Sequence, residues 1–136
     1  MNESRVLETV AAPDRLPEVT RFVRECYRAA PGCDAAKLDL IVEELFLNIA
    51  MHACPGELVR VACSLAGPSL VSLEFSYGGP PFDPTSDAPA PDLDASLADR
   101  PIGGLGLFLV NKMAASLAYN CDDGTNRLTV EVTLDA

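Results

Sequence analysis

The sequence predicts a two-layer α/β sandwich of the α+β class, in which helices cover one face of an antiparallel or mixed sheet. Three observations lead to this fold class. Two segments have the apolar spacing of helices, several shorter segments have the composition of strands, and turn-rich connections join those strands. Because 136 residues suffice for one buried core, we expect a single domain over residues 1–136.

The chain is predicted to begin with a strand and a helix. The strand runs from Arg5 to Ala12, and Pro13-Asp14 separates it from the helix. Pro31-Gly32 marks the end of this first helix. Its apolar positions, spaced as in a helix, are Leu16, Val19, Phe22, Val23 and Tyr27.

A second helix is predicted after Asp34, a residue that favours the N-cap position. Cys54-Pro55-Gly56 ends it. The apolar stripe of this helix consists of Leu38, Ile41, Leu45 and Ile49. The helix therefore has one buried side and one edge on which polar residues can face a pocket.

The C-terminal part is predicted to be a strand pair, a long loop, a third helix and a closing hairpin. The first two strands are Glu57–Leu65 and Leu70–Phe75, antiparallel across residues 66–69. Residues 78–101 contain six prolines and read as a loop or lid. The third helix is expected over Gly103–Ser116, and the hairpin over Leu117–Asn120 and Arg127–Leu134.

Composition excludes several classes of protein. A net charge of −10 argues against nucleic acid or an anionic membrane as the partner, so a protein or a small ligand is expected. The five cysteines form no C-x-x-C pair, which favours reduced thiols in a cytoplasm. We expect neither a secretory signal nor a membrane span.

Three polar residues of the second helix stand at successive i, i+4 positions: Glu44, Asn48 and His52. Each immediately precedes a residue of the helix's apolar side, so the three border the buried stripe. They could be no more than the polar edge of an amphipathic helix. In a pocket, however, Asn48 could give its oxygen to Mg²⁺, and Glu44 could deprotonate a water or hydroxyl.

A glycine-rich turn precedes the third helix. Gly103, Gly104 and Gly106 fall within four residues, more than a single unusual φ requires. Backbone without side chains, next to a helix N-terminus, lets phosphate oxygens reach N–H groups. The alternative is an ordinary turn before a helix. With one histidine in the chain and no cysteine pair, zinc is not expected.

Together these segments resemble a known family over nearly the whole chain. The matching segments are the Glu44-x-x-x-Asn48-x-x-x-His52 box, Gly79-Pro80-Pro81-Phe82-Asp83-Pro84, Arg100-Pro101-Ile102-Gly103-Gly104-Leu105-Gly106-Leu107 and Asp123-Gly124-Thr125-Asn126-Arg127-Leu128-Thr129. They look like the bacterial anti-sigma regulatory factors with serine/threonine kinase activity, small members of the GHKL (Bergerat-fold) ATPase superfamily. The order and spacing match that family.

The resemblance implies a site for ATP and Mg²⁺. Asn48 would be the Mg²⁺ ligand and Glu44 the catalytic base, with His52 and Gly79 near the nucleotide. The turn Gly103-Gly104-Leu105-Gly106-Leu107 would cradle the phosphates, and residues 84–102 would form the ATP lid. Thr129 would help to hold the adenine end.

The resemblance also implies partners. A kinase of this kind phosphorylates a serine or threonine on an anti-anti-sigma antagonist, and in its competing state it binds a sigma factor. Phosphorylation thereby switches the partner, and the ligands are ATP and ADP. A homodimer is expected by analogy alone.

One position departs from the family pattern. The family has an adenine-binding Asp two residues before Gly79, where this chain has Tyr77. Ser76 is a poor substitute, because alternation places it on the other strand face. Loss of a buried acceptor costs roughly 1–3 kcal/mol. Tyr77 could stack on the base or fill its pocket, so the alternatives are an ATP-dependent kinase and a nucleotide-impaired binding module. A sensor histidine kinase fits less well, since no dimerisation helix is present.

Overall fold

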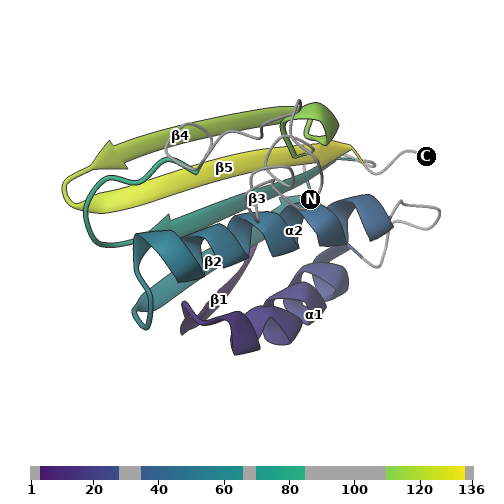
Figure 1. The fold of residues 1–136 in the computed structure, drawn as a ribbon. Helices are drawn as coiled ribbons and strands as arrows, with labels where there is room; N and C mark the ends of the chain where they lie inside the picture. Colours follow the sequence, from purple (N-terminus) through teal and green to yellow (C-terminus); the bar gives the residue numbers. More distant parts are fainter. Residues whose placement is uncertain (1–3, 28–34, 66–69, 85–109, 134–136) are drawn as a thin grey trace, which may run out of the picture.

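The computed structural model describes residues 4–27, 35–65, 70–84 and 110–133. In Figure 1 two helices lie on one side of a five-stranded sheet. The described part therefore has two layers, and the predicted α+β sandwich is confirmed.

All strand pairs of the sheet are antiparallel, and the strand order is β1-β2-β3-β5-β4. The prediction had left a mixed sheet open, and the observed pairing settles that question. The strands are β1 Ser4–Val10, β2 Leu58–Leu65, β3 Leu70–Tyr77, β4 Ser116–Asp122 and β5 Thr125–Thr133.

The helices follow the predicted periodicity closely. After a short 3-10 turn, η1 (Pro13–Arg15), α1 spans Leu16–Tyr27, and α2 spans Ala35–Asn48. A π-helical turn, η2 (Ile49–Ala53), continues α2. Both helices pack on the same sheet face. The strand residues on that face are therefore buried beneath them.

The core lies between the helices and the sheet, and its members alternate along each strand. In β3, Val71, Leu73, Phe75 and Tyr77 are buried, whereas the residues between them are half-buried. This alternation is the period of two that a sheet with one covered face requires. The helices contribute the other half of the core, namely Val19, Val23, Leu38, Ile41, Val42, Leu45, Phe46 and Ile49.

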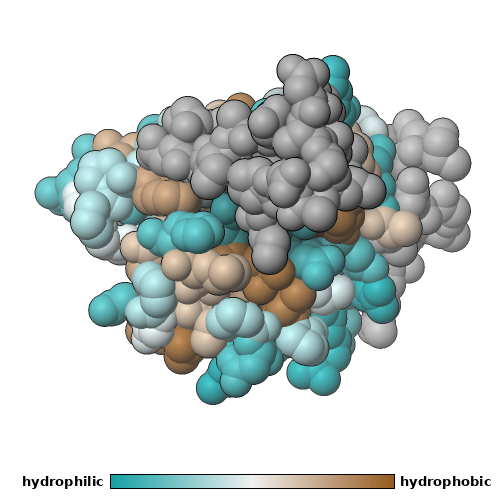
Figure 2. Space-filling model, in the orientation of Figure 1, coloured by the Kyte–Doolittle hydropathy of each residue, from teal (hydrophilic) through white to brown (hydrophobic). Residues whose placement is uncertain are grey.

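The two sides of the molecule differ in the residues that they present to solvent. On the helix side, shown in Figure 2, hydrophilic residues dominate the rim, and hydrophobic residues appear toward the middle. The opposite sheet face has no helix in the described residues and carries polar side chains such as Arg60, Glu74 and Arg127. No helix in the described ranges is long and apolar enough to cross a membrane.

The closing hairpin is longer than predicted. We expected strands over Leu117–Asn120 and Arg127–Leu134, but β4 reaches Asp122, and β5 begins at Thr125. Only Asp123 and Gly124 remain in the turn, with φ angles of 53° and 78°. Two positive φ values are typical of a type I′ turn, whose twist matches that of the flanking strands.

The third helix ends earlier than predicted. Residues 110–113 are helical, and the N–H of Ala114 donates to the carbonyl oxygen of Val110 at 2.9 Å. Ser116, the predicted last helical residue, is the first residue of β4. The N–H of Ala115 donates to the carbonyl of Glu131 in β5 at 2.8 Å, so sheet pairing ends the helix. The predicted helix start, Gly103, lies outside the described residues.

Candidate functional site

Glu44 and Asn48 lie one turn apart near the end of α2. Asn48 is buried, with 7% of its surface exposed, and its Nδ2 donates to the carbonyl oxygen of Glu44 at 2.7 Å. This hydrogen bond uses the nitrogen of the amide and so sets its orientation. The oxygen Oδ1 is thereby left as the acceptor, which is the atom that a hard cation prefers.

The carboxyl group of Glu44 is half-buried. Partial burial raises its pKa above the ordinary value, and the neighbouring charge of Glu43 raises it further. A raised pKa makes a carboxylate a stronger base at neutral pH. The local environment of Glu44 therefore suits the role of proton acceptor that the sequence suggested.

His52 differs from Glu44 and Asn48 in its surroundings. It lies in η2, where the N–H of Cys54 donates to the carbonyl of Ile49, five residues earlier, at 3.2 Å. Such a turn is wider than an α-helical turn, and single π-turns often occur at functional sites. His52 is exposed, and its ring stacks on Phe82 with centroids 6.2 Å apart and planes 24° apart.

The loop after β3 lies against the end of this helix. Gly79 has φ +90°, and a Cβ built on it would stand 3.4 Å from the carbonyl oxygen of Ala53. At this positive φ a residue with a side chain would strain the backbone, while its Cβ would only touch η2. The fold thus brings together two motifs that are about thirty residues apart in the sequence, the Glu44 to His52 box and the segment 79–84.

Tyr77 points into the interior at the end of β3, as strand alternation predicted. It is 2% exposed, and its hydroxyl donates to the carbonyl oxygen of Phe82 at 2.7 Å. Burial raises the pKa of this phenol, and nearby Tyr119 and Asp83 raise it further, so the hydroxyl stays protonated. It is a hydrogen-bond donor already in use, where the family pattern has a carboxylate acceptor.

Asn126 is a functional candidate that the sequence reasoning missed. It is fully buried at the start of β5, directly opposite Tyr77. Its Oδ1 accepts from the N–H of Phe82 at 3.0 Å and from the hydroxyl of Tyr119. Its Nδ2 lies 3.2, 3.3 and 3.4 Å from the carbonyl oxygens of Tyr77, Gly78 and Pro80.

We call Tyr77, Phe82, Tyr119 and Asn126 the Asn126 cluster. Both polar groups of the Phe82 backbone are satisfied within it, by Tyr77 and by Asn126. The cluster therefore holds the loop 78–82 against β5. A sequence signal existed, since Asn126 lies two residues after Gly124 in an otherwise apolar-alternating strand, but a polar residue there also suits a turn.

The prediction for Thr129 was wrong. Its neighbours Leu128 and Val130 are the buried residues of β5, so Thr129 faces the opposite, helix-free side of the sheet. It pairs with Glu74 of β3 and Ala118 of β4. It cannot contact a ligand held beside Asn48. Gly103, Gly104, Leu105, Gly106 and Leu107, together with most of the predicted lid, lie outside the described residues.

The described residues fit a Mg²⁺–nucleotide complex at the metal end only. Asn48 offers an oriented oxygen, although among the described residues no three His, Cys, Asp or Glu side chains are grouped to hold a metal alone. Mg²⁺ commonly takes one or two protein oxygens together with substrate phosphates and water. At the base end, Tyr77 supplies no carboxylate.

The chain belongs to the family of histidine kinase-like ATPase domains, whose model matches residues 9–132. The predicted membership in the GHKL ATPase superfamily is thereby confirmed. The chain is 37% identical over 126 residues to the serine/threonine-protein kinase BtrW of Bordetella bronchiseptica, a match that covers 91% of this chain and 78% of that protein.

A solved structure gives the same architecture. The histidine kinase AdeS of Acinetobacter baumannii superposes with a TM-score of 0.53 at 14% sequence identity, over 97% of this chain and 70% of that chain. At this identity the likeness shows the fold alone. It supports the arrangement of sheet and helices described above.

We predict that Asn126→Ala lowers the free energy of unfolding by roughly 1–3 kcal/mol, because buried donors on Phe82 and Tyr119 lose their acceptor. The measurement is urea unfolding combined with hydrogen exchange of the Phe82 amide, which should accelerate. Asn120→Ala, at an exposed position in β4, is the matched control and should leave both unchanged. Equal effects of the two variants would show that the cluster does not hold the loop.

We predict that Glu44→Gln stabilises the protein at pH 7.5. The folded-state pKa of Glu44 lies above its unfolded value, so the ionised carboxylate destabilises the folded state once the pH exceeds both. The gain in melting temperature should shrink as the pH falls through the folded pKa, and it should vanish below about pH 4, where the group is protonated in both states. A gain independent of pH would point to packing instead.

Proposed function

We propose that this protein is an ATP-dependent serine/threonine protein kinase. The observation that carries the proposal is the pairing of Asn48 and Glu44 on α2 beside the loop at Gly79, in a member of the histidine kinase-like ATPase family. The name of its relative BtrW supports the same activity.

The chain's own residues would divide the work. Asn48 would hold Mg²⁺ through Oδ1, because its Nδ2 is engaged by the Glu44 carbonyl. Glu44 would accept the proton of the partner's serine or threonine hydroxyl as that oxygen attacks. Bound ATP would supply the phosphoryl group, and ADP would be released. The raised pKa of Glu44 favours this proton transfer.

As a regulator, the protein would act as an anti-sigma factor. The partners proposed are an anti-anti-sigma antagonist, which would be the substrate, and a sigma factor, which would be bound in the competing state. The support is the resemblance of its motifs and the strongly negative charge of the chain, which suits protein partners better than nucleic acid. The proposed place of action is the cytoplasm, as part of transcription control by partner switching.

A second function is favoured by the Asn126 cluster. At the position where the family has an adenine-binding Asp, this chain has the buried ring of Tyr77, whose hydroxyl donates to the carbonyl oxygen of Phe82. If the base of a nucleotide requires that space, the chain would be a partner-binding module of the same fold with impaired nucleotide binding. The two functions differ in one measurable property, the affinity for ATP.

We predict that the protein binds ATP more tightly with Mg²⁺ than without it, and that Asn48→Ala loses this magnesium dependence. The measurement is calorimetric titration with ATP and ADP, each with and without Mg²⁺. Asn120→Ala is the matched control, because it removes an exposed amide outside the site. Unchanged magnesium dependence in Asn48→Ala would contradict the metal assignment, and absence of binding up to millimolar ATP would leave the binding module.

We predict that Tyr77→Asp tightens ATP binding about tenfold, because the carboxylate would accept a hydrogen bond from the adenine amino group. Calorimetry on a variant first shown by circular dichroism to be folded measures the change. Tyr77→Phe, which keeps the ring but adds no acceptor, is the control and should show no gain. If Tyr77→Asp shows no gain either, this position does not read the base.

A further inference from the structure

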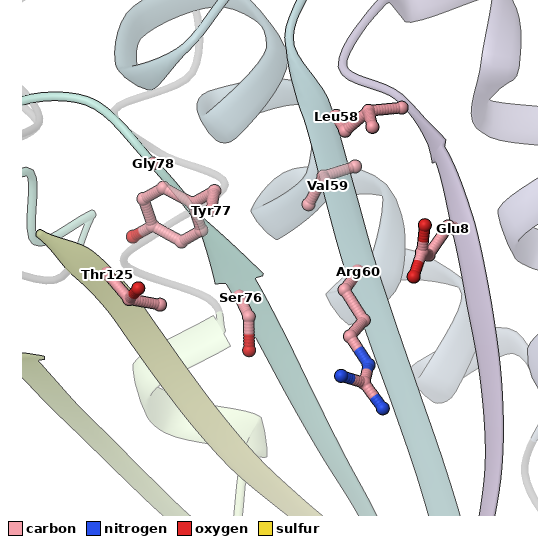
Figure 3. Close-up of a pocket in the computed structure, with 8 residues that line it drawn as sticks. All are labelled: Glu8, Leu58, Val59, Arg60, Ser76, Tyr77, Gly78 and Thr125. Carbon is pink, nitrogen blue, oxygen red and sulfur yellow. The ribbon is translucent and has the colours of Figure 1, made fainter.

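The helix-free face of the sheet carries a hollow that extends beyond the proposed kinase site, although Tyr77 lines one edge of it. Two overlapping depressions, with volumes of about 250 and 530 Å³, share Arg60, Ser76 and Thr125. Figure 3 shows the first of them, with residues from β1, β2, β3 and β5 along its floor. Asn48 and Glu44 lie on α2, against the other face, so this is a separate place on the molecule.

Two arginines flank one hydroxyl in this hollow. In the sheet register Arg60 of β2 and Arg127 of β5 are the direct partners of Ser76, one on each side. Directly opposed side chains in antiparallel strands begin about 5 Å apart, so both guanidinium groups can reach a ligand placed over Ser76. The chain has only 10 Lys and Arg residues against 20 acidic ones, so two arginines beside one serine form a local concentration of positive charge in an acidic protein.

Neither guanidinium group has a partner among the described residues. The ion pair identified there, Arg24 with Asp39, lies on the helices, and the side chains of Arg60 and Arg127 make no hydrogen bond in the described ranges, although their backbones pair within the sheet. In Figure 3 the guanidinium of Arg60 extends away from the carboxylate of Glu8, in the direction in which the Ser76 hydroxyl points. These donors therefore remain available to a ligand.

The carboxylates nearby limit what the ligand can be. Glu8 is the sheet neighbour of Arg60, and Glu74 accepts a long hydrogen bond, 3.4 Å, from the Ser76 hydroxyl. At physiological salt, charges within about 8 Å of one another still interact strongly. A polyanion laid across this face would meet both carboxylates, whereas a single anionic group needs to contact only the two arginines.

We infer that Arg60, Arg127, Ser76 and Thr125 form a binding site for one phosphate group. Two guanidinium groups and the Thr125 hydroxyl offer more donors than the two oxygens of a carboxylate readily accept, and they match the three terminal oxygens of a phosphate monoester. The one proton of the Ser76 hydroxyl is donated to Glu74 and is not counted among them. The site does not depend on the proposed kinase activity, since none of its residues lies on the helix side of the sheet.

The test is a titration of the full chain with inorganic phosphate, followed by amide NMR at constant ionic strength. We expect saturable shifts of the Arg60, Ser76 and Arg127 amides. Arg60→Gln and Arg127→Gln should each weaken the affinity about tenfold, the usual cost of one charge-assisted contact. Arg21→Gln, which removes the same charge from an exposed position on α1, should leave the affinity unchanged.

Three outcomes would overturn the inference. Shifts that do not saturate would mean an adventitious ion only, and an equal loss in Arg21→Gln would mean a response to net charge. Shifts confined to the amides near Asn48 would place phosphate at the kinase site instead. A parallel titration with O-phosphoserine distinguishes the source. Tighter binding than inorganic phosphate indicates a phosphorylated side chain, and equal binding indicates a free phosphate.

Discussion

One constraint organises this molecule: in its described part the sheet is covered by helices on one face only. The three central strands, β2, β3 and β5, therefore alternate between core residues and residues facing away from the helices. The face beneath α2 holds Tyr77 and lies opposite Asn48 of that helix, and the other face holds Arg60 and Arg127. Two chemically distinct surfaces arise from a single sheet because neighbouring residues of a strand point in opposite directions.

Among the described residues, Asn126 is the most deeply buried polar residue of the otherwise mostly apolar sheet face. A buried amide is costly unless its hydrogen bonds are made, and here each polar atom of the side chain has a partner. The cost of burial is offset by a connection between β3, β5 and the loop 78–82. The same connection includes Tyr77 at the end of β3, where a nucleotide base would be expected. The side chain at this position can therefore either hold the loop 78–82 or contact the base.

The geometry near Asn48 favours phosphate and metal chemistry more clearly than it favours adenine recognition. Asn48 is oriented by a main-chain hydrogen bond that belongs to α2 itself, and the raised pKa of Glu44 follows from burial at the same helix edge. Neither feature depends on Tyr77. A protein of this family can thus keep the groups that act on phosphate while its contact with the base changes.

The parts of the fold that were predicted correctly depend on neighbours in the sequence. The extent of α1 follows from local periodicity, and so does the position of α2, which carries Glu44 and Asn48. The inward direction of Tyr77 follows from strand alternation in the same way. The assignment of Thr129 failed because it rested on likeness to a motif. The two-residue turn before β5 sets the register that turns this side chain away.

The sequence by itself determined the fold class and the family, and it singled out Glu44 and Asn48 as candidates for phosphate chemistry, because periodicity, glycine spacing and the Glu44 to His52 box are all local. Only the tertiary structure decided that Asn126 meets a loop more than forty residues earlier in the chain, and that Arg60 and Arg127 enclose Ser76. Such neighbours depend on the order of strands in the sheet. That order is set by packing of the whole core, which local sequence patterns do not contain.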